Sequence, residues 1–113
     1  MEVINQTRQT SLGGNINLAD NFFTRLVGLL TTKKLPSGAG LIIKPCSGVH
    51  TLGMRYCIDV LFVNKDHEVV KVIAAMKPGR VAVVSGSAYV IELPAGTAAA
   101  TCTKPGDRLA LID

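Results

Sequence analysis

The sequence predicts a mainly β (α+β) fold: a compact, mainly antiparallel sandwich or barrel of seven or eight short strands, with one short helix near residues 21–30. Three features of the chain lead to this fold class. Turn-forming clusters of Gly, Pro, Asn and Ser recur about every ten residues, which leaves room only for short elements. Only one segment repeats its apolar residues with a helical period. Strands do not alternate with helices, so a parallel doubly wound sheet is not expected.

The expected strands are short apolar segments that end at turn residues. In chain order they cover residues 2–8, 16–18, 39–44, 58–63, 68–75, 81–84, 88–93 and 108–112, and the second is short enough to be only a lead-in. Residues 58–63 and 68–75 should form a hairpin, because a turn of Asn, Lys, Asp and His separates them. Residues 97–101 are ambiguous, since their alanines favour a helix and their threonines an extended chain. Gly106 and Asp107 are assigned to a tight turn with no other role.

The one helical stripe lies between residues 21 and 30. Phe22, Leu26 and Leu30 are spaced i, i+4 and i+8, so their side chains share one face of a helix. Asp20 or Asn21 can cap its N-terminus. We therefore expect a single short helix at this position.

Composition and length indicate one globular domain, residues 1–113. The chain is 48% hydrophobic and 18% charged, unlike a disordered segment. No apolar run approaches the roughly 18 residues that span a membrane, and the N-terminus lacks the basic start and apolar core of a secretory signal. Three cysteines without a Cys-x-x-Cys pair favour reduced thiols in a cytoplasmic protein.

The net charge of +4 is unevenly distributed, because residues 21–58 carry five basic residues and no acid. Such a zone could attract phosphate, nucleic acid or an anionic lipid surface. It contains no dense run of Lys and Arg and has few aromatic residues. A nucleic-acid-binding surface usually has both a basic run and aromatic residues. Nucleic acid is therefore not the expected partner.

The stretch from residue 45 to 64 carries the strongest indication of function. Its second half, residues 58–63, is apolar at successive positions, so this strand should be covered on both faces. Its first half is interrupted by Gly48 and Gly53 and mixes polar with apolar residues. A buried strand that begins in a glycine-broken polar segment is typical of the edge of a pocket, and we look for a ligand site there.

The candidate ligand-binding residues are this polar segment and the charged residues that lie in apolar surroundings. They are His50, Thr51, Met54, Arg55, Asp59, Arg25 and Glu92. In a functional interpretation, Arg25 or Arg55 binds an anionic group of the ligand. In a structural interpretation, the same charges form an ion pair that holds the helix on the sheet. Asp59 should be mostly buried and accept at least two hydrogen bonds, one of them from an arginine.

A catalytic or metal site is the alternative. His50, Cys57 and Asp59, together with Cys46, have ligand types that suit zinc, and a cysteine beside a histidine can act as a nucleophile. The spacing matches no known zinc pattern. If residues 50–59 run extended, His50 points to one side while Cys57 and Asp59 point to the other, and a bend at Gly53 could bring them together.

The sequence therefore favours an accessory module that binds a small molecule or a peptide and has no catalysis of its own, with a hydrolase or metal-assisted enzyme built on His50, Cys57 and Asp59 as the alternative. No catalytic residue, metal ligand or cofactor is assigned. The identity of the ligand and the oligomeric state do not follow from the sequence.

Four motifs occur in order along nearly the whole chain: Arg-Leu-Val-Gly-Leu at 25–29, Met-Arg-Tyr-Cys-Ile-Asp-Val-Leu-Phe-Val at 54–63, Tyr-Val-Ile-Glu-Leu-Pro-Ala-Gly at 89–96, and Gly106-Asp107. Together they resemble the bacterial and archaeal family called domain of unknown function 192. The resemblance implies a compact, mainly β, jelly-roll-like domain with a small helix. It implies no catalytic role, because the activity of the family is not established. Cys57 departs from the family, whose members commonly have proline there.

Overall fold

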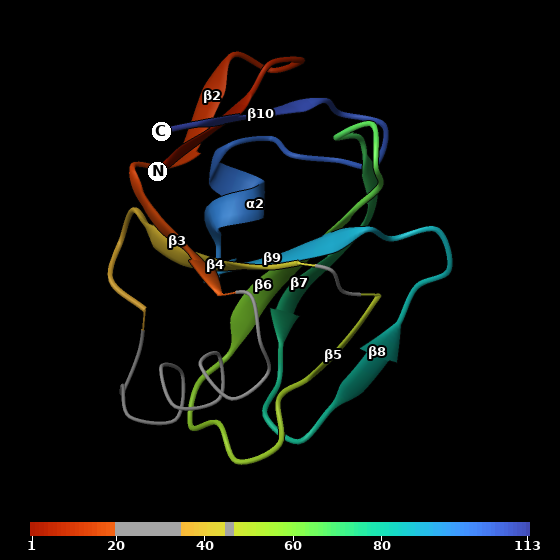
Figure 1. The fold of residues 1–113 in the computed structure, drawn as a ribbon. Coiled ribbons are helices and arrows are strands. Elements are labelled where there is room, and N and C mark those ends of the chain that lie inside the picture. Colours follow the sequence, from red (N-terminus) through yellow and green to blue (C-terminus); the bar gives the residue numbers. More distant parts are fainter. Residues whose placement is uncertain (20–34, 45–46) are drawn as a thin grey trace.

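The structure is a computed structural model that describes residues 1–19, 35–44 and 47–113. This part of the chain is mainly β and contains one short helix (Figure 1). The strands are β1 (Glu2–Asn5), β2 (Thr10–Gly13), β3 (Asn15–Ala19), β4 (Ala39–Ile43), β5 (Gly48–His50), β6 (Ile58–Val63), β7 (Val69–Met76), β8 (Val81–Val83), β9 (Tyr89–Pro94) and β10 (Leu109–Ile112). The helix is α2 (Thr97–Ala100). No helix of the described ranges is long and apolar enough to cross a membrane.

The strands form three sheets. A five-stranded sheet has the order β3-β4-β9-β6-β7, a three-stranded sheet has the order β10-β1-β2, and β5 pairs with β8 in a two-stranded ribbon. All pairs are antiparallel except β3 with β4, which run parallel. In Figure 1 the three-stranded sheet lies above the five-stranded sheet with α2 between them, and the β5–β8 ribbon lies below.

The strand predicted at residues 58–63 is β6, and all six of its residues are buried. It lies between β9 and β7, and the predicted hairpin with the following strand is present as β6–β7. Side chains of a strand alternate between its two faces. Leu61 and Val63 pack in a core that includes Ala98 of α2, here called the α2-side core. Ile58, Val60 and Phe62 pack in a second core with Val49 and Ala82 of the β5–β8 ribbon, here called the ribbon-side core. The expectation that this strand is covered on both faces is confirmed.

Several details differ from the sequence prediction. The described residues contain ten strands rather than seven or eight, because residues 10–13 form β2 and residues 48–50 form β5. The ambiguous segment at 97–101 is helical over Thr97–Ala100. The strand orders do not confirm a jelly roll. The helix expected near residues 21–30 lies outside the described residues.

Residues 50–59 do not run extended, and of the two paths considered for them the one with a bend at Gly53 is the one observed. β5 ends at His50 and β6 begins at Ile58, and the chain between them forms turns and bends. Gly53 within this connection has a φ of 82°, a conformation that favours glycine because it has no Cβ. Side-chain alternation along a strand therefore says nothing about how His50, Cys57 and Asp59 are placed.

Candidate functional site

The five-stranded sheet divides the residues predicted to line a ligand site. Asp59 of β6 is opposite Leu93 of β9, and Val60 is opposite Glu92. Cross-strand partners point to the same face of a sheet. Asp59 therefore lies on the α2 side with Leu93, while Glu92 lies on the ribbon side with Val60. Both carboxylates are fully buried, but they project from opposite faces and do not meet.

Asp59 holds the fold together through two backbone contacts. Its Oδ1 accepts a hydrogen bond from the N–H of Ala75 on β7, and its Oδ2 accepts one from the N–H of Ala98 in α2, both at 2.8 Å. Gly96, the N-cap residue of α2, has no side chain to cap the helix, and Asp59 replaces that cap from a distant strand. The expected burial and the two hydrogen bonds are confirmed. The expected arginine donor is wrong, because both donors are backbone N–H groups.

Thr51 is fully buried and holds the turn between β7 and β8. Its hydroxyl donates to the carbonyl oxygen of Lys77 at 2.7 Å and accepts from the N–H of Arg80 at 2.9 Å. Its own N–H donates to the carbonyl oxygen of Arg80 at 2.8 Å, and its carbonyl oxygen accepts from the N–H of Gly79 at 2.9 Å. The side chain predicted to contact a ligand is thus engaged with residues 77–80.

The other predicted residues that the structure describes, His50, Met54 and Arg55, lie within or shortly after β5. Met54 is buried in the ribbon-side core, which favours a packing role. His50 is half-buried on β5, and Arg55 is exposed in the connection to β6. Arg25 lies outside the described residues. Cys57 is half-buried.

The alternative built on His50, Cys57 and Asp59 finds little support in this geometry. His50 belongs to the ribbon, whereas Asp59 points to the other side of the five-stranded sheet. Within residues 1–19, 35–44 and 47–113, no three His, Cys, Asp or Glu side chains are grouped in a way that could hold a metal ion.

The outer edge of β8 carries backbone groups that are not used within the sheet. The N–H of Val84 donates to Ser47, and the N–H of Thr51 donates to Arg80, so alternate residues of the ribbon are hydrogen-bonded pairs. By this register Ala82 bonds to β5, whereas the N–H and C=O groups of Val81 and Val83 point away from β5. In the described part of the chain, β8 has no partner on that outer edge.

The same two residues also expose their side chains. Ala82 packs against the ribbon-side core, and Val81 and Val83 project outward with 67% and 74% of their surface exposed. Leu52, directly after Thr51, is 52% exposed. Of the large apolar side chains in the described residues, these two valines are the most exposed, and they lie two residues apart on one face of a strand. β8 lies at the margin of the molecule in Figure 1.

The two edges of the five-stranded sheet are covered or distorted. The first residues of β7 are bonded to the segment before β10, through Val69 with Gly106 and Asp107, and the β6–β7 register contains irregularities. On the outer edge of β3, Ile16 exchanges two hydrogen bonds with Met1. The amino group of Met1 donates to the carbonyl oxygen of Ile16 at 2.9 Å, and the N–H of Ile16 donates to the carbonyl oxygen of Met1 at 3.0 Å. Such devices prevent another strand from pairing. The outer edge of β8 differs from these two edges because no described residue bonds to it.

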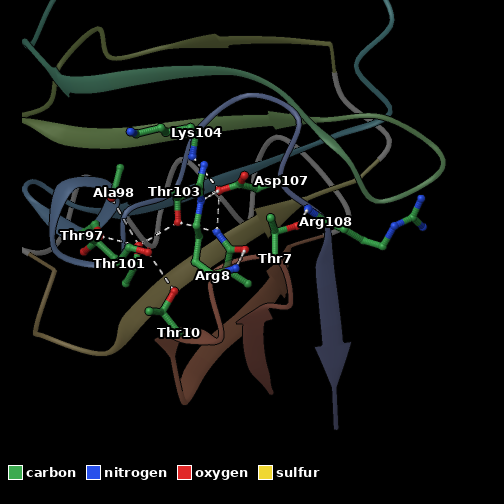
Figure 2. Close-up of polar contacts among 11 residues, drawn as sticks. Thr7, Arg8, Thr10, Thr97, Ala98, Thr101, Thr103, Lys104, Asp107 and Arg108 are labelled. Carbon is green, nitrogen blue, oxygen red and sulfur yellow. Dashed lines mark hydrogen bonds and ion pairs between the residues drawn. The ribbon is translucent and has the colours of Figure 1, made fainter.

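Sequence reasoning missed a buried polar cluster around Asp107 (Figure 2). The Oδ2 of Asp107 accepts hydrogen bonds from Asn5 at 3.0 Å, from the Nε of Arg8 at 3.1 Å and from the N–H of Lys104 at 2.9 Å. Burial raises the pKa of Asp107, but these hydrogen bonds and the Arg8 charge together hold the pKa below its ordinary value. Asn5 also donates to the hydroxyl of Thr103 at 3.1 Å. The cluster ties the loop before β10 to the end of β1.

The only signal for this cluster in the sequence is the Gly106-Asp107 motif itself. A carboxylate after a turn glycine is usually a solvated turn residue. Its partners Asn5 and Arg8 come from the opposite end of the chain, so sequence spacing does not indicate them.

These observations define a mainly β domain with one buried carboxylate on each face of its central sheet and an unpaired outer edge on β8. The chain belongs to the family DUF192, Uncharacterized ACR, whose model matches residues 3–111. The resemblance noted in the sequence is confirmed.

Relatives and solved structures agree with this membership. The chain is 34% identical to the UPF0127 protein PF1050 of Pyrococcus furiosus over 113 residues, which cover 95% of each protein. It is 30% identical to the UPF0127 protein PYRAB11210 of Pyrococcus abyssi, over 97% of each. A crystal structure of a protein of unknown function from Novosphingobium aromaticivorans has the same fold, with a TM-score of 0.77 and 22% identity over 97% of this chain and 82% of that one.

Proposed function

We propose that the protein is a peptide-binding module that takes an extended segment of a partner protein as an additional strand on the outer edge of β8. The observation that carries this proposal is the coincidence of two features at Val81 and Val83. Their outward backbone groups can pair with another strand, and their exposed side chains can pack against its side chains.

The sequence left two ligand classes open, a small molecule and a peptide. A row of backbone donors and acceptors along a strand edge matches another extended chain, whose groups repeat with the same spacing. The side chains of a neighbouring strand would also cover the exposed Val81 and Val83. Both arguments favour the peptide.

The proposal is tested with octapeptides that alternate valine with threonine or aspartate. In the isotopically labelled protein, binding should change the amide chemical shifts of residues 80–84 and of their partners on β5. Fluorescence anisotropy with the labelled peptide then gives Kd for wild type and variants.

The decisive variant is Val83→Pro, with Val83→Thr as its matched control. Proline removes the outward N–H but breaks no bond to β5, because that N–H is not used there. Proline should weaken binding by at least about tenfold, or about 1.4 kcal/mol. Threonine keeps the backbone groups and the β-branched shape, and should change Kd by less than about threefold. Equal binding by wild type and Val83→Pro, or shift changes confined to other surfaces, would refute the proposal.

A further inference from the structure

We infer that the turn Lys77–Arg80 selects an acidic residue in the segment that docks on β8. This inference rests on the proposed strand addition and adds the chemistry of the partner. Lys77 and Arg80 are both exposed, and Arg80 directly precedes the first residue of β8. A carboxylate on the docked strand, placed beside the start of β8, would lie next to these two cations.

The turn is held rigidly by Thr51. Four hydrogen bonds of 2.7 to 2.9 Å join this one buried residue to the backbone of Lys77, Gly79 and Arg80. Gly79 has a φ of 78°, which completes the turn at low cost. Because the backbone is fixed from beneath, the two cationic side chains are presented at one place and lose less freedom when an anion binds. Thr51 is thus a positioning residue.

The charges around the ribbon support an acidic partner. Residues 47–58 and 69–91 contain no Asp or Glu, so no acid of these segments competes for the two cations. The far end of β8 is followed by the neutral residues Ser85, Gly86 and Ser87. Since Lys77 and Arg80 lie at the start of β8, charge favours an acidic residue of the partner beside that end of the strand. A second copy of β8 would bring no acid to Lys77 and Arg80, so it would leave these cations without a partner.

The test uses four probe hexapeptides with free ends blocked. Two have the order Asp-Thr-Val-Thr-Val-Thr and its reverse, which allow for either direction of docking, and the other two have Asn in place of Asp. At about 20 mM salt, at least one Asp peptide should bind about fivefold more tightly than its Asn counterpart. At about 500 mM salt, the same peptide should bind less than about twofold more tightly than its Asn counterpart.

The double variant Lys77→Gln/Arg80→Gln should lose this preference and bind the Asn peptide as wild type does. Lys104→Gln is the matched control, because Lys104 is also exposed but lies in the loop between α2 and β10. It should keep the preference. Thr51→Val should bring the ratio of the Asp-peptide affinity to the Asn-peptide affinity close to one. Thr51→Ser keeps the hydroxyl and should leave this ratio as in wild type.

The possible failures are distinguishable. Equal binding of Asp and Asn peptides at low salt, with binding lost in Val83→Pro, overturns the acidic selection and leaves strand addition standing. Binding of neither peptide overturns both. A monomer–dimer equilibrium that Val83→Pro abolishes would identify a second copy as the occupant and overturn the acidic partner.

Discussion

Asp59→Asn is expected to destabilise the protein strongly. The carboxylate accepts one hydrogen bond at each oxygen, from Ala75 and from Ala98. Asparagine has one accepting oxygen and one NH2 group, so it keeps one of these bonds and turns a donor toward the other N–H. Ala98 is buried, whereas Ala75 is exposed, and we expect the amide oxygen to remain on Ala98.

The cost follows from this geometry. One charge-assisted hydrogen bond is lost, worth about 1.5–3 kcal/mol, while water near the exposed Ala75 offsets part of the penalty for its unpaired N–H. The expected loss in the free energy of unfolding is therefore about 2–3 kcal/mol. For a chain of this size, that corresponds to a drop in Tm of roughly 10 °C.

Thermal melts at neutral pH measure this loss. Asp66→Asn is the matched control, since Asp66 is exposed in the turn between β6 and β7 and the substitution changes the charge equally. The control should remain within about 0.5 kcal/mol of wild type. If Asp59→Asn has the same Tm as wild type, the structural role of the carboxylate is refuted. A catalytic role would then be favoured, because functional groups commonly reduce stability.

Two further predictions concern the buried cluster and the sheet. Folding holds the pKa of Asp107 below its ordinary value of 3.8, so its contribution to stability is complete above that pH and is lost as the pH falls through the lower folded pKa. Denaturant unfolding between pH 6 and about 2 measures the difference in unfolding free energy between wild type and Asp107→Asn. This difference should shrink below pH 3.8, and a difference that stays constant would contradict the prediction. Gly40→Ala should lower the unfolding free energy, because a Cβ there would lie 2.7 Å from the carbonyl oxygen of Glu92 and 2.9 Å from Leu93. Gly14→Ala, with nothing within 4 Å, is the control, and equal melts of the two variants would show that β4 shifts to make room.

Local patterns in the sequence predicted most of the elements. The strand at residues 58–63 was predicted with its observed bounds, because a run of apolar residues between polar ones fixes both its conformation and its burial. Strand β5 was not predicted, since its glycine and histidine are weak strand formers and its stability comes from pairing with β8. The parallel pair β3–β4 also depends on long-range packing that periodicity does not contain.

The candidate site was predicted only in part. The interrupted pattern at Gly48 and Gly53 suggested the edge of a pocket, and in the structure Gly48 and His50 belong to strand β5 of the ribbon. The grouping of Asp59 with Glu92 failed because strand register, which the sequence does not specify, decides that they face opposite sides of the sheet. The sequence predicted a strand at β8 but not the exposure of its two valines, because a Val-Ala-Val segment reads the same whether it is buried or exposed.

Amide hydrogen exchange of the free protein tests the open edge of β8 most directly. The register predicts alternation along the strand: Ala82 should be protected by its bond to β5 and Val84 by its bond to Ser47 just before β5, while Val81 and Val83 should exchange at rates near those of solvent-exposed amides. A bound peptide should then protect Val81 and Val83 as well. Equal protection of all four amides in the free protein would show that the edge is already paired and would contradict the proposed site.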